Sequence, residues 1–506
     1  MRLGIDFGTT RTTVALVDRG NYPVVSFPDA AGDAQEYFPS VVALDGDRLR
    51  YGFDALTAAN NGATLVRSFK RALGAGDVNA HTTITVGDRE VALLDLMVGY
   101  LGALKEALAT NSSISDEYDP AQAEATVVAV PAHAHGAQRF LTLEAFRRAG
   151  FAVSAMLNEP SAAGFEYTHR QGRTLSSRRT RVIVYDLGGG TFDASLVSVD
   201  GVDHEIVGSL GLNMLGGDDF DAALADCALE AAGLTLDDID LRTYLALLDD
   251  CRDAKEHLSP QSRRILLELD GQQLTVPVAD FYERATPLVQ ASMQAMAPLV
   301  EDLDGSSTLA SDIAGIYLVG GASGLPLVPR LLRETFGRRV YRSPYPAAST
   351  AIGLAIAADE DAGYSLTDKL SRGFGVFREA DAGTTVSFDP IVTRDQRVPE
   401  HGDVVITRRY RAAHNVGWYR FVEYTEVDRS GEPRGDIMPF AQILFPFDPA
   451  LQSEGADVTT VEIRRTNGPM VEERYEIDAN GIVRVRITDL ATGYTRTHAL
   501  STSAAA

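Results

Sequence analysis

The 506-residue sequence contains only two cysteines, Cys227 and Cys251. Two cysteines cannot build a disulfide framework, which favours a reducing compartment such as the cytosol. The sequence lacks an apolar stretch long enough to span a bilayer, and its first residues lead into a glycine motif instead of a signal peptide. We therefore expect a cytoplasmic protein without a membrane partner.

Basic residues are also scarce. The chain has 46 lysines and arginines against 70 aspartates and glutamates, a formal net charge of −24. A protein that binds nucleic acid needs a basic face, so nucleic acid is not an expected partner. The sequence has no GxxxxGK[ST] loop, which excludes a P-loop NTPase. The length allows two or three domains with large cores.

One glycine-rich stretch organises the rest of the chain. The apolar residues 182–185 predict a buried strand, which is followed by Asp186, the glycines 188–190, Thr191 and Asp193. Glycines let a backbone approach a ligand closely and point its N–H groups at phosphate oxygens. A carboxylate at the strand end suits Mg²⁺ held through water. The plain alternative is an ordinary glycine-rich hairpin with surface aspartates.

The same pattern occurs near the N-terminus. Residues 3–10 run from a strand through Asp6 and Gly8 to Thr9 and Thr10, before a second strand-like run at 12–17. The repeat predicts two similar lobes that present opposed phosphate-binding hairpins. A third copy, at 316–324, lacks the aspartate and suits a close approach to a nucleoside.

Alternating strands and helices up to residue 358 predict an α/β architecture. A strand is expected at 125–130 and a strand at 205–210. Apolar periodicity predicts helices over five further stretches, which are 53–73, 93–108, 138–149, 241–258 and 348–358.

Beyond residue 358 the composition changes. An acidic linker without clear period covers 359–369, and a β domain is expected over 370–500, followed by a disordered tail at 501–506. Asn480 and Gly481 form a strong two-residue hairpin signal. Strands are predicted at 404–410, 418–427, 458–465, 472–477 and 482–488.

These motifs together resemble the 70-kDa heat-shock protein chaperones of the DnaK type, over almost the whole chain. The resemblance implies a two-lobed actin-like ATPase fold followed by an antiparallel β-sandwich. It rests on residues 4–10, 70–71, 130–132, 137–139, 158–163, 186–193, 216–221, 318–321 and 477–485.

The resemblance also implies a role for individual residues in binding and hydrolysing ATP. Lys70 would reach the terminal phosphate, Glu159 would position the attacking water, and Asp6 and Asp186 would hold the water shell of Mg²⁺. Thr191 would complete the catalytic group, and Pro131 and Arg139 would belong to a relay between nucleotide and β domain. The nucleotide, ATP or ADP, would lie against Gly8, Thr9, Thr10, Gly188, Gly189, Gly190, Asp193, Gly216, Gly217, Lys255, Ser259, Gly320 and Gly321.

The sequence departs from that family where the base of the nucleotide would lie. Arg252 stands where the family usually has glutamate, and Glu256 where it has arginine. Gly324 replaces a second arginine, and Tyr345 replaces an acidic residue. Each lost guanidinium–ring stack removes about 0.5–2 kcal/mol. Nucleotide binding is still expected, with base selectivity in question.

The coupling segment departs as well. The family's run of leucines before an aspartate becomes 362–366 here, which is much less apolar. The sequence ends after the β domain, so the helical lid of the family is not expected. These features predict weaker or different coupling between nucleotide and client.

Three functions remain open. The first is an ATP-dependent chaperone that binds extended apolar segments, with a J-domain co-chaperone and an exchange factor as possible partners. The second is a nucleotide-gated module for one dedicated protein partner. The third, a small-molecule kinase on the same fold, is disfavoured by the β domain.

Two groups of residues are given a structural interpretation. His133 and His135 lack a third ligand nearby and are expected to shape a loop instead of binding a metal. The aromatic residues Trp418, Tyr419, Phe421 and Tyr424 are expected in the sandwich core.

Overall fold

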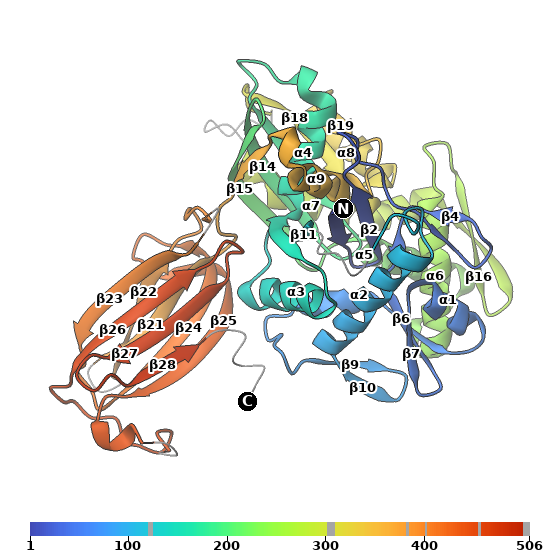
Figure 1. Cartoon of the computed structure of the whole chain (residues 1–506). Helices are drawn as coiled ribbons and strands as arrows, with labels where there is room; N and C mark the ends of the chain where they lie inside the picture. Colours follow the sequence, from blue (N-terminus) through green and yellow to red (C-terminus); the bar gives the residue numbers. More distant parts are fainter. Residues whose placement is uncertain (120–124, 301–308, 381–383, 400–401, 454–456, 499–506) are drawn as a thin grey trace.

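A computed structural model describes residues 1–119, 125–300, 309–380, 384–399, 402–453 and 457–498. The chain forms two α/β lobes and a separate β-sandwich that lies beside them (Figure 1). The predicted fold, two actin-like lobes followed by an antiparallel β-sandwich, is confirmed.

The central sheets of the two lobes share one topology. In each, an antiparallel hairpin is extended by two parallel strands, so the repeat predicted from the glycine motifs is also a structural repeat. The first sheet has the order β12 (Val153–Asn158), β11 (Ala125–Val130), β1 (Arg2–Phe7), β2 (Arg11–Leu16) and β5 (Phe38–Pro39). The second has the order β19 (Val340–Arg342), β18 (Ile313–Val319), β13 (Arg181–Leu187), β14 (Phe192–Asp200), β15 (Asp203–Leu212) and β20 (Ser365–Thr367).

Helices α4 (Glu159–Gln171) and α9 (Ser349–Ala358) pack tightly against each other and against the sheets. A Cβ atom built on Gly353 would lie 1.8 Å from the carbonyl oxygen of Ala162, and one built on Gly4 would lie 2.4 Å from that of Ala351. Only glycine permits these backbone approaches, which fix the lobes around the two helices.

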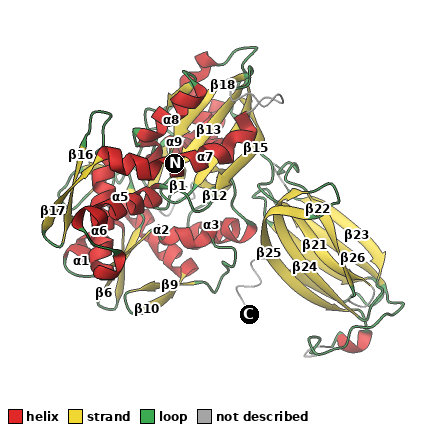
Figure 2. Cartoon of the chain, turned by 180° about the vertical axis from the view of Figure 1, so that it is seen from behind, coloured by secondary structure: helices red, strands yellow, loops and turns green. Residues whose placement is uncertain are grey.

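Among the other helices, α5 and α6 pack against each other and against the β16–β17 hairpin (residues 264–277), as the view from behind shows (Figure 2). The bounds of the other helices are α1 (Gly52–Asn60), α2 (Leu93–Thr110), α3 (Gly136–Arg148), α5 (Gly217–Ala232), α6 (Leu241–Glu256), α7 (Val278–Val300) and α8 (Leu327–Phe336). Short 3-10 turns occur at η1 (Phe69–Gly74), η2 (Gly172–Thr174), η3 (Leu236–Asp238), η4 (Gly321–Gly324), η5 (Glu360–Ala362) and η7 (Pro449–Leu451).

The helix predicted over 53–73 is wrong beyond Asn60. The chain turns at Gly62, forms a strand that pairs with β6, and enters η1 through Ser68, whose φ is +53°. Pairing with a neighbouring strand overrides the local helical pattern here.

The small sheets of the lobes are β3 (Phe27–Pro28) with β4 (Ala34–Gln35), β7 (Arg48–Tyr51) with β6 (Val41–Asp45) and β8 (Thr64–Arg67), β9 (Thr83–Val86) with β10 (Arg89–Ala92), and β16 (Arg264–Leu269) with β17 (Gln272–Pro277).

The β domain consists of two four-stranded antiparallel sheets. One sheet has the order β22 (Thr385–Val392), β21 (Gly373–Ala380), β24 (Val416–Val427) and β25 (Pro433–Pro446). The other has the order β23 (Val404–Arg411), β26 (Met470–Ile477), β27 (Val483–Asp489) and β28 (Thr495–His498).

Most of the predicted strands of this domain are confirmed, and so is a hairpin around Asn480 and Gly481, where Gly481 has a φ of +72°. The predicted two-residue turn is wrong, because the N–H of Asp478 donates to the carbonyl of Ile482 and leaves three residues, 479–481, in the turn. The strand predicted at 458–465 is wrong, because these residues form turns and a single bridge between Arg465 and His414. Trp418 is half-buried and lines a pocket, whereas Tyr419, Phe421 and Tyr424 are buried in the core as expected.

The predicted linker is not without structure. Its strand β20 extends the sheet of the second lobe by pairing in parallel with β15. Tyr364 packs edge-on against Phe165, and the side chain of Asp368 accepts a hydrogen bond of 2.8 Å from Asn158. The linker is therefore docked on the lobes despite its low apolar content. The tail predicted at 501–506 lies outside the described residues.

Each of the two lobes and the β-sandwich has its own large apolar core. Within the residues that the structure describes, helices are too short or too polar to cross a membrane.

Candidate functional site

A cleft between the two lobes gathers most of the residues that the sequence predicts for nucleotide binding. Its walls come from the β1–β2 hairpin, the β13–β14 hairpin, η1, and the N-terminal ends of α4 and α5. The predicted residues that line it are Asp6, Gly8, Thr9, Thr10, Lys70, Pro131, Glu159, Asp186, Gly188, Gly189, Thr191, Gly217, Lys255, Gly320 and Gly321.

Five predicted residues lie elsewhere. Asp193 is buried behind the wall, and Gly190 and Gly216 pack against neighbouring backbone or side chains. Arg139 lies at the contact with the β domain. Ser259 is exposed and bonded to Ser262, because α6 ends at Glu256 and the following turn leads away from the cleft.

The two hairpins that are predicted to bind phosphate face and touch each other. A Cβ atom on Gly189 would lie 2.7 Å from the Thr10 side chain, and one on Gly190 would lie 3.1 Å from the Thr9 side chain. The N-terminus of α5 joins the same turn, because the N–H of Gly217 donates to the carbonyl of Gly188 over 2.9 Å. This geometry brings two threonine hydroxyls and a glycine turn together, as a phosphate cradle requires.

Lys70 is the cation at the centre of one wall. Its side chain is only 5% exposed, and its Nζ donates to the carbonyl oxygen of Phe7 and lies 3.8 Å from a carboxylate oxygen of Glu159. Glu159 is the first residue of α4, so its position follows from the helix start predicted at Pro160. We call Asp6, Lys70, Glu159 and Asp186 the phosphate side of the cleft.

Burial and mutual repulsion disturb the three carboxyl groups of the phosphate side. Burial raises the pKa of Asp6 to about 6, against the opposing effect of Lys70. The pKa of Glu159 is raised by burial, with Lys70 opposing and the nearby aspartates adding to the rise. The pKa of Asp186 is raised by burial and by the charges of Asp6 and Asp193. One lysine cannot neutralise this group, so it favours an added cation.

The donor set fits a magnesium ion held largely through water. Asp6 and Asp186 stand at equivalent strand positions of the two repeats, and hard carboxylate oxygens are what Mg²⁺ prefers. Among the described residues, no group of three His, Cys, Asp or Glu side chains is arranged to ligate a metal directly. Two carboxylates alone suit an ion that keeps most of its water shell.

The opposite wall is a network of ion pairs. Arg252 on α6 lies 3.0 Å from Asp218, 3.3 Å from Asp221 and 3.9 Å from Asp249, and its side chain is only 17% exposed. Lys255 contacts Asp221 at 2.5 Å. We call Asp218, Asp221, Asp249, Arg252 and Lys255 the base side of the cleft.

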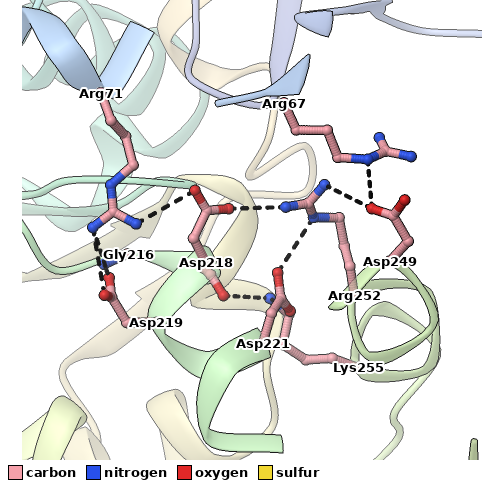
Figure 3. Close-up of polar contacts among 10 residues, drawn as sticks. Arg67, Arg71, Gly216, Asp218, Asp219, Asp221, Asp249, Arg252 and Lys255 are labelled. Atoms are coloured by element: carbon pink, nitrogen blue, oxygen red, sulfur yellow. Dashed lines mark hydrogen bonds and ion pairs between the residues drawn. The ribbon is translucent and has the colours of Figure 1, made fainter. Parts of the chain in front are cut away.

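Arginines of the first lobe join this network from across the cleft (Figure 3). Arg71 approaches Asp218 and Asp219 at 3.5 and 3.4 Å, and Arg67 pairs with Asp249. A third arginine of the first lobe, Arg11, pairs with Glu256 across the cleft. Glu256 makes a cross-cleft pair itself, and Arg252 shares Asp218 and Asp249 with the arginines of the first lobe, so both residues belong to one set of contacts that spans the cleft.

Sequence reasoning noticed Arg252 and Glu256 only as departures from a family pattern, and it missed Arg11, Arg67 and Asp249. Their partners lie 245 and 182 residues away in the chain, so no local spacing signals these pairs. Gly324 was expected to leave the base without a stacking arginine. The guanidinium of Arg342 lies 3.0 Å from where a Cβ atom of residue 324 would be.

The cleft is also connected to the β domain. Arg139 donates from Nε to the carbonyl of Asn480 over 2.8 Å and from Nη1 to Asn158 over 2.9 Å. Asn158 immediately precedes Glu159 and contacts Asp368 of the linker. Pro131 lines the cleft itself. Arg139 thus joins the sandwich to the residue that precedes Glu159, and Pro131 lies at the cleft. That these two residues form a relay stays a prediction.

This arrangement defines an actin-like two-lobed ATPase fold with an added β-sandwich. A family model described as "Hsp70 protein" matches residues 2–370. The chain belongs to the Hsp70 family of chaperones.

Individual relatives support the same assignment. The chain is similar to the protein named "Chaperone protein HscA" of Enterobacter sp. (strain 638), with 29% identity over 514 residues that cover 97% of this chain and 77% of the relative. The protein of the same name in Serratia proteamaculans (strain 568) is 35% identical over 371 residues, covering 70% of this chain and 57% of the relative. A homologue of that name in Tolumonas auensis is 32% identical over 367 residues, covering 71% and 57%.

Proposed function

We propose that the protein binds ATP with Mg²⁺, hydrolyses it slowly, and couples this cycle to the binding of polypeptide segments. The observation that carries the proposal is the uncompensated charge of the phosphate side, where Lys70 opposes the charge of Asp6 and Glu159 and, among the described residues, no cation opposes that of Asp186. Such a group is completed by a divalent cation and the phosphates that accompany it. Phosphoryl transfer needs mainly charge neutralisation and in-line placement, which this set supplies.

Each residue of the phosphate side has a separate task in this proposal. The ammonium of Lys70 neutralises charge on the terminal phosphate, and the carboxylate of Glu159 orients the attacking water. Thr9, Thr10 and Thr191 surround the phosphate chain with hydroxyl groups. Asp6 and Asp186 would hold magnesium, which when bound supplies charge neutralisation for the transferred phosphate.

The proposed site for segments is a pocket of about 540 Å³ in the sandwich. It lies among the last residues of β21, the first residues of β24 and the segment 410–414, away from the strand ends that contact the lobes. Tyr410, Trp418, Tyr419 and Phe447 give it an aromatic lining, and its arginines are Arg378, Arg411 and Arg465.

The floor of this pocket is fixed by a buried ion pair. Glu473, which is fully buried, accepts hydrogen bonds from Arg378 and from the hydroxyls of Tyr410 and Tyr475, the last two over 2.5 Å. Arg378 also contacts Asp389 at 2.9 Å. Arg378 is therefore already neutralised by acidic side chains of the sandwich, and Arg411, whose Nη1 donates to the carbonyl of Gly468 over 3.1 Å, adds positive charge to the lining. The pocket suits segments with aromatic side chains, and acidic residues beside them.

A direct experiment tests the hydrolysis. We expect phosphate release from ATP that requires Mg²⁺, stops on chelation, and is lost in Asp186→Ala. A variant that keeps the wild-type rate, while ATP binding by calorimetry remains, would place hydrolysis at another site. A J-domain co-chaperone and a nucleotide exchange factor are proposed partners, and each should accelerate one step of this cycle.

The character of the pocket also favours a second candidate, a nucleotide-gated module for one dedicated protein. Its arginines and tyrosines differ from the apolar lining that a general chaperone of extended apolar segments would use. An array of peptides separates the two functions. Binding of many apolar peptides, released by ATP, supports the general chaperone, whereas retention of one sequence class supports the dedicated module.

A further inference from the structure

One glutamine lines the cleft together with Lys70 and Glu159 and has no task in the reaction proposed above. Gln138 lies in the first turn of α3 and is only 4% exposed. Its Oε1 atom has no hydrogen-bond partner among the described residues. A buried acceptor without a partner is rare in a folded protein, so this atom indicates a donor that binds next to it.

The fold places Gln138 and Glu159 at the same edge of the first sheet. Strands β11 and β12 are parallel, with Val130 paired to Asn158, so the segments that follow the two strands leave the sheet side by side. The N–H of Gln138 donates to Nδ1 of His135 over 3.4 Å, and this cap begins α3 at the cleft. Helix α3 also packs against η1, which provides the lysine of the phosphate side.

A buried hydrogen bond holds the beginnings of α3 and α4 together. Nη1 of Arg139 donates to Oδ1 of Asn158 over 2.9 Å, and the two residues are 5% and 3% exposed. Each is the direct neighbour of one residue of interest, Gln138 or Glu159. Because both helix starts belong to the first lobe, the two side chains keep their relative position when the lobes move apart.

An attacking water needs two acceptors to be held in one orientation. A single hydrogen bond to Glu159 leaves the water free to rotate about that bond. A second acceptor fixes both O–H groups and turns a lone pair of the water toward the phosphorus. The amide oxygen of a glutamine accepts such a bond without adding charge, which suits a site where carboxyl groups already repel one another.

We propose that Gln138 is the second acceptor for the water that attacks ATP, and that it positions this water together with Glu159. This inference rests on the proposed function, since it concerns the same hydrolysis. In this step the water oxygen forms a bond to the terminal phosphorus, and the bond from that phosphorus to the bridging oxygen breaks. ADP leaves with the electron pair of the broken bond. Both protons of the water stay on the phosphate, which leaves as dihydrogen phosphate.

Three substitutions of Gln138 separate hydrogen bonding from packing. Gln138→Met keeps the unbranched shape and removes the amide, and Gln138→Leu repeats the test with another shape, so that one folding failure does not end it. We expect each to lower kcat about 10-fold, the scale of one hydrogen bond. KM for ATP should change less than about 2-fold, because a group that acts on the water adds little to nucleotide binding. Gln138→Glu keeps an acceptor and should recover most of the rate at saturating ATP.

Thr142→Val is the matched control. Thr142 follows one turn later on α3, is fully buried, and carries an Oγ1 atom that likewise has no hydrogen-bond partner among the described residues. It is not among the described residues that line the cleft. The substitution removes the same kind of atom from the same helix, so kcat should stay within about 2-fold of wild type.

A transition-state analogue gives a second readout on the full chain. ADP with Mg²⁺ and aluminium fluoride imitates the transferred phosphate together with its attacking water. Its dissociation constant should rise about 10-fold in Gln138→Met, whereas that of ADP alone should change less than about 2-fold. Wild-type kcat in both Gln138→Met and Gln138→Leu, or an equal loss of kcat in Thr142→Val, would overturn the inference. Absence of hydrolysis in the wild-type protein would instead refute the proposed function.

Discussion

On the phosphate side of the cleft, the single cation Lys70 acts on Asp6 and Glu159, and Asp186 has no cation among the described residues that offsets its charge. On the base side, each carboxylate is paired with an arginine or a lysine. The phosphate side therefore has an excess of negative charge until a cation binds, whereas each carboxylate of the base side already has a cationic partner. Two walls of one cleft therefore differ in how much of their stability depends on a ligand.

The difference has a consequence for recognition. A ligand that meets unbalanced, buried charge gains strongly from neutralising it. A ligand that meets satisfied ion pairs gains little, because any new contact with Arg252 or Asp218 competes with an existing one. Affinity should therefore come mainly from the phosphates and the metal, and only weakly from the base.

The largest expected effect contrasts one residue from each wall. Lys70→Met removes the only cation of the phosphate side, and we expect kcat for ATP to fall at least about 100-fold, the usual scale for losing one electrostatic stabiliser. Arg252→Met removes a base-side cation that is also mostly buried, with 17% of its side chain exposed, and kcat should change less than about 10-fold. Single-turnover phosphate release measures both. A comparable fall of kcat in the two variants would contradict the proposed difference between the phosphate side and the base side.

The next effect concerns stability. The pKa of Asp186 is raised from its usual value near 3.8 by burial, Asp6 and Asp193, with no opposing contribution. Such a carboxyl group favours folding most below its unfolded-state pKa, and the advantage is lost as the pH rises through the folded-state pKa. Asp186→Asn should therefore stabilise the metal-free protein at about pH 7.5 by about 1–2 kcal/mol, and by much less near pH 4.5.

Calorimetric unfolding at the two pH values measures this. Asp312→Asn serves as control, because Asp312 is exposed and paired with Arg181 at 3.0 Å, so its removal should not stabilise at either pH. Added Mg²⁺ should reduce the advantage of the variant, since the metal relieves the same repulsion. A variant that is less stable than wild type at neutral pH would contradict the assignment of uncompensated charge.

The phosphate side was also the part of the site that the sequence made predictable. Asp6 and Asp186 end apolar strands and precede glycines, which is a local pattern, and their repetition predicted the opposed hairpins. The hairpin at Asn480 and Gly481 was predictable for the same reason. Local chemistry determines these features, so a single sequence reveals them.

The base side was not predictable, because its contacts join segments far apart in the chain. Nothing local to Arg67 identifies Asp249 as its partner. Pairing with distant strands also explains why part of the helix predicted over 53–73 is instead β8, and why the predicted linker at 359–369 contains the strand β20. In these places the decisive energy comes from a distant neighbour instead of the local sequence.

A smaller effect concerns the choice of base. The base side contributes satisfied ion pairs, so we expect the dissociation constants of ATP and GTP to differ less than about 10-fold, or about 1.4 kcal/mol. Isothermal titration calorimetry with Mg²⁺ present measures both. Inorganic triphosphate, which has no base, should bind only slightly more weakly than ATP and GTP. A preference for ATP of about 1,000-fold would show that the base wall makes specific contacts after all.

The smallest effect tests whether the cross-cleft pairs restrain opening. Arg67 and Asp249 are both about one-third exposed, so their pair is worth only about 0.5–1 kcal/mol. Because the pair joins the two lobes, that energy must be supplied when the cleft opens, and Arg67→Gln should speed release of ADP about 2- to 5-fold. Stopped-flow displacement of a fluorescent ADP measures the rate.

Asp249→Asn should speed release of ADP to a similar extent, and the double variant should add little. Arg284→Gln is the control, since Arg284 pairs with Asp226 and Glu230 within one lobe. Raising the salt concentration should reduce the difference between wild type and Arg67→Gln, because salt screens the partly exposed pair. Release that is equally fast in wild type and Arg67→Gln at low salt would show that the base side lines the cleft without holding it closed.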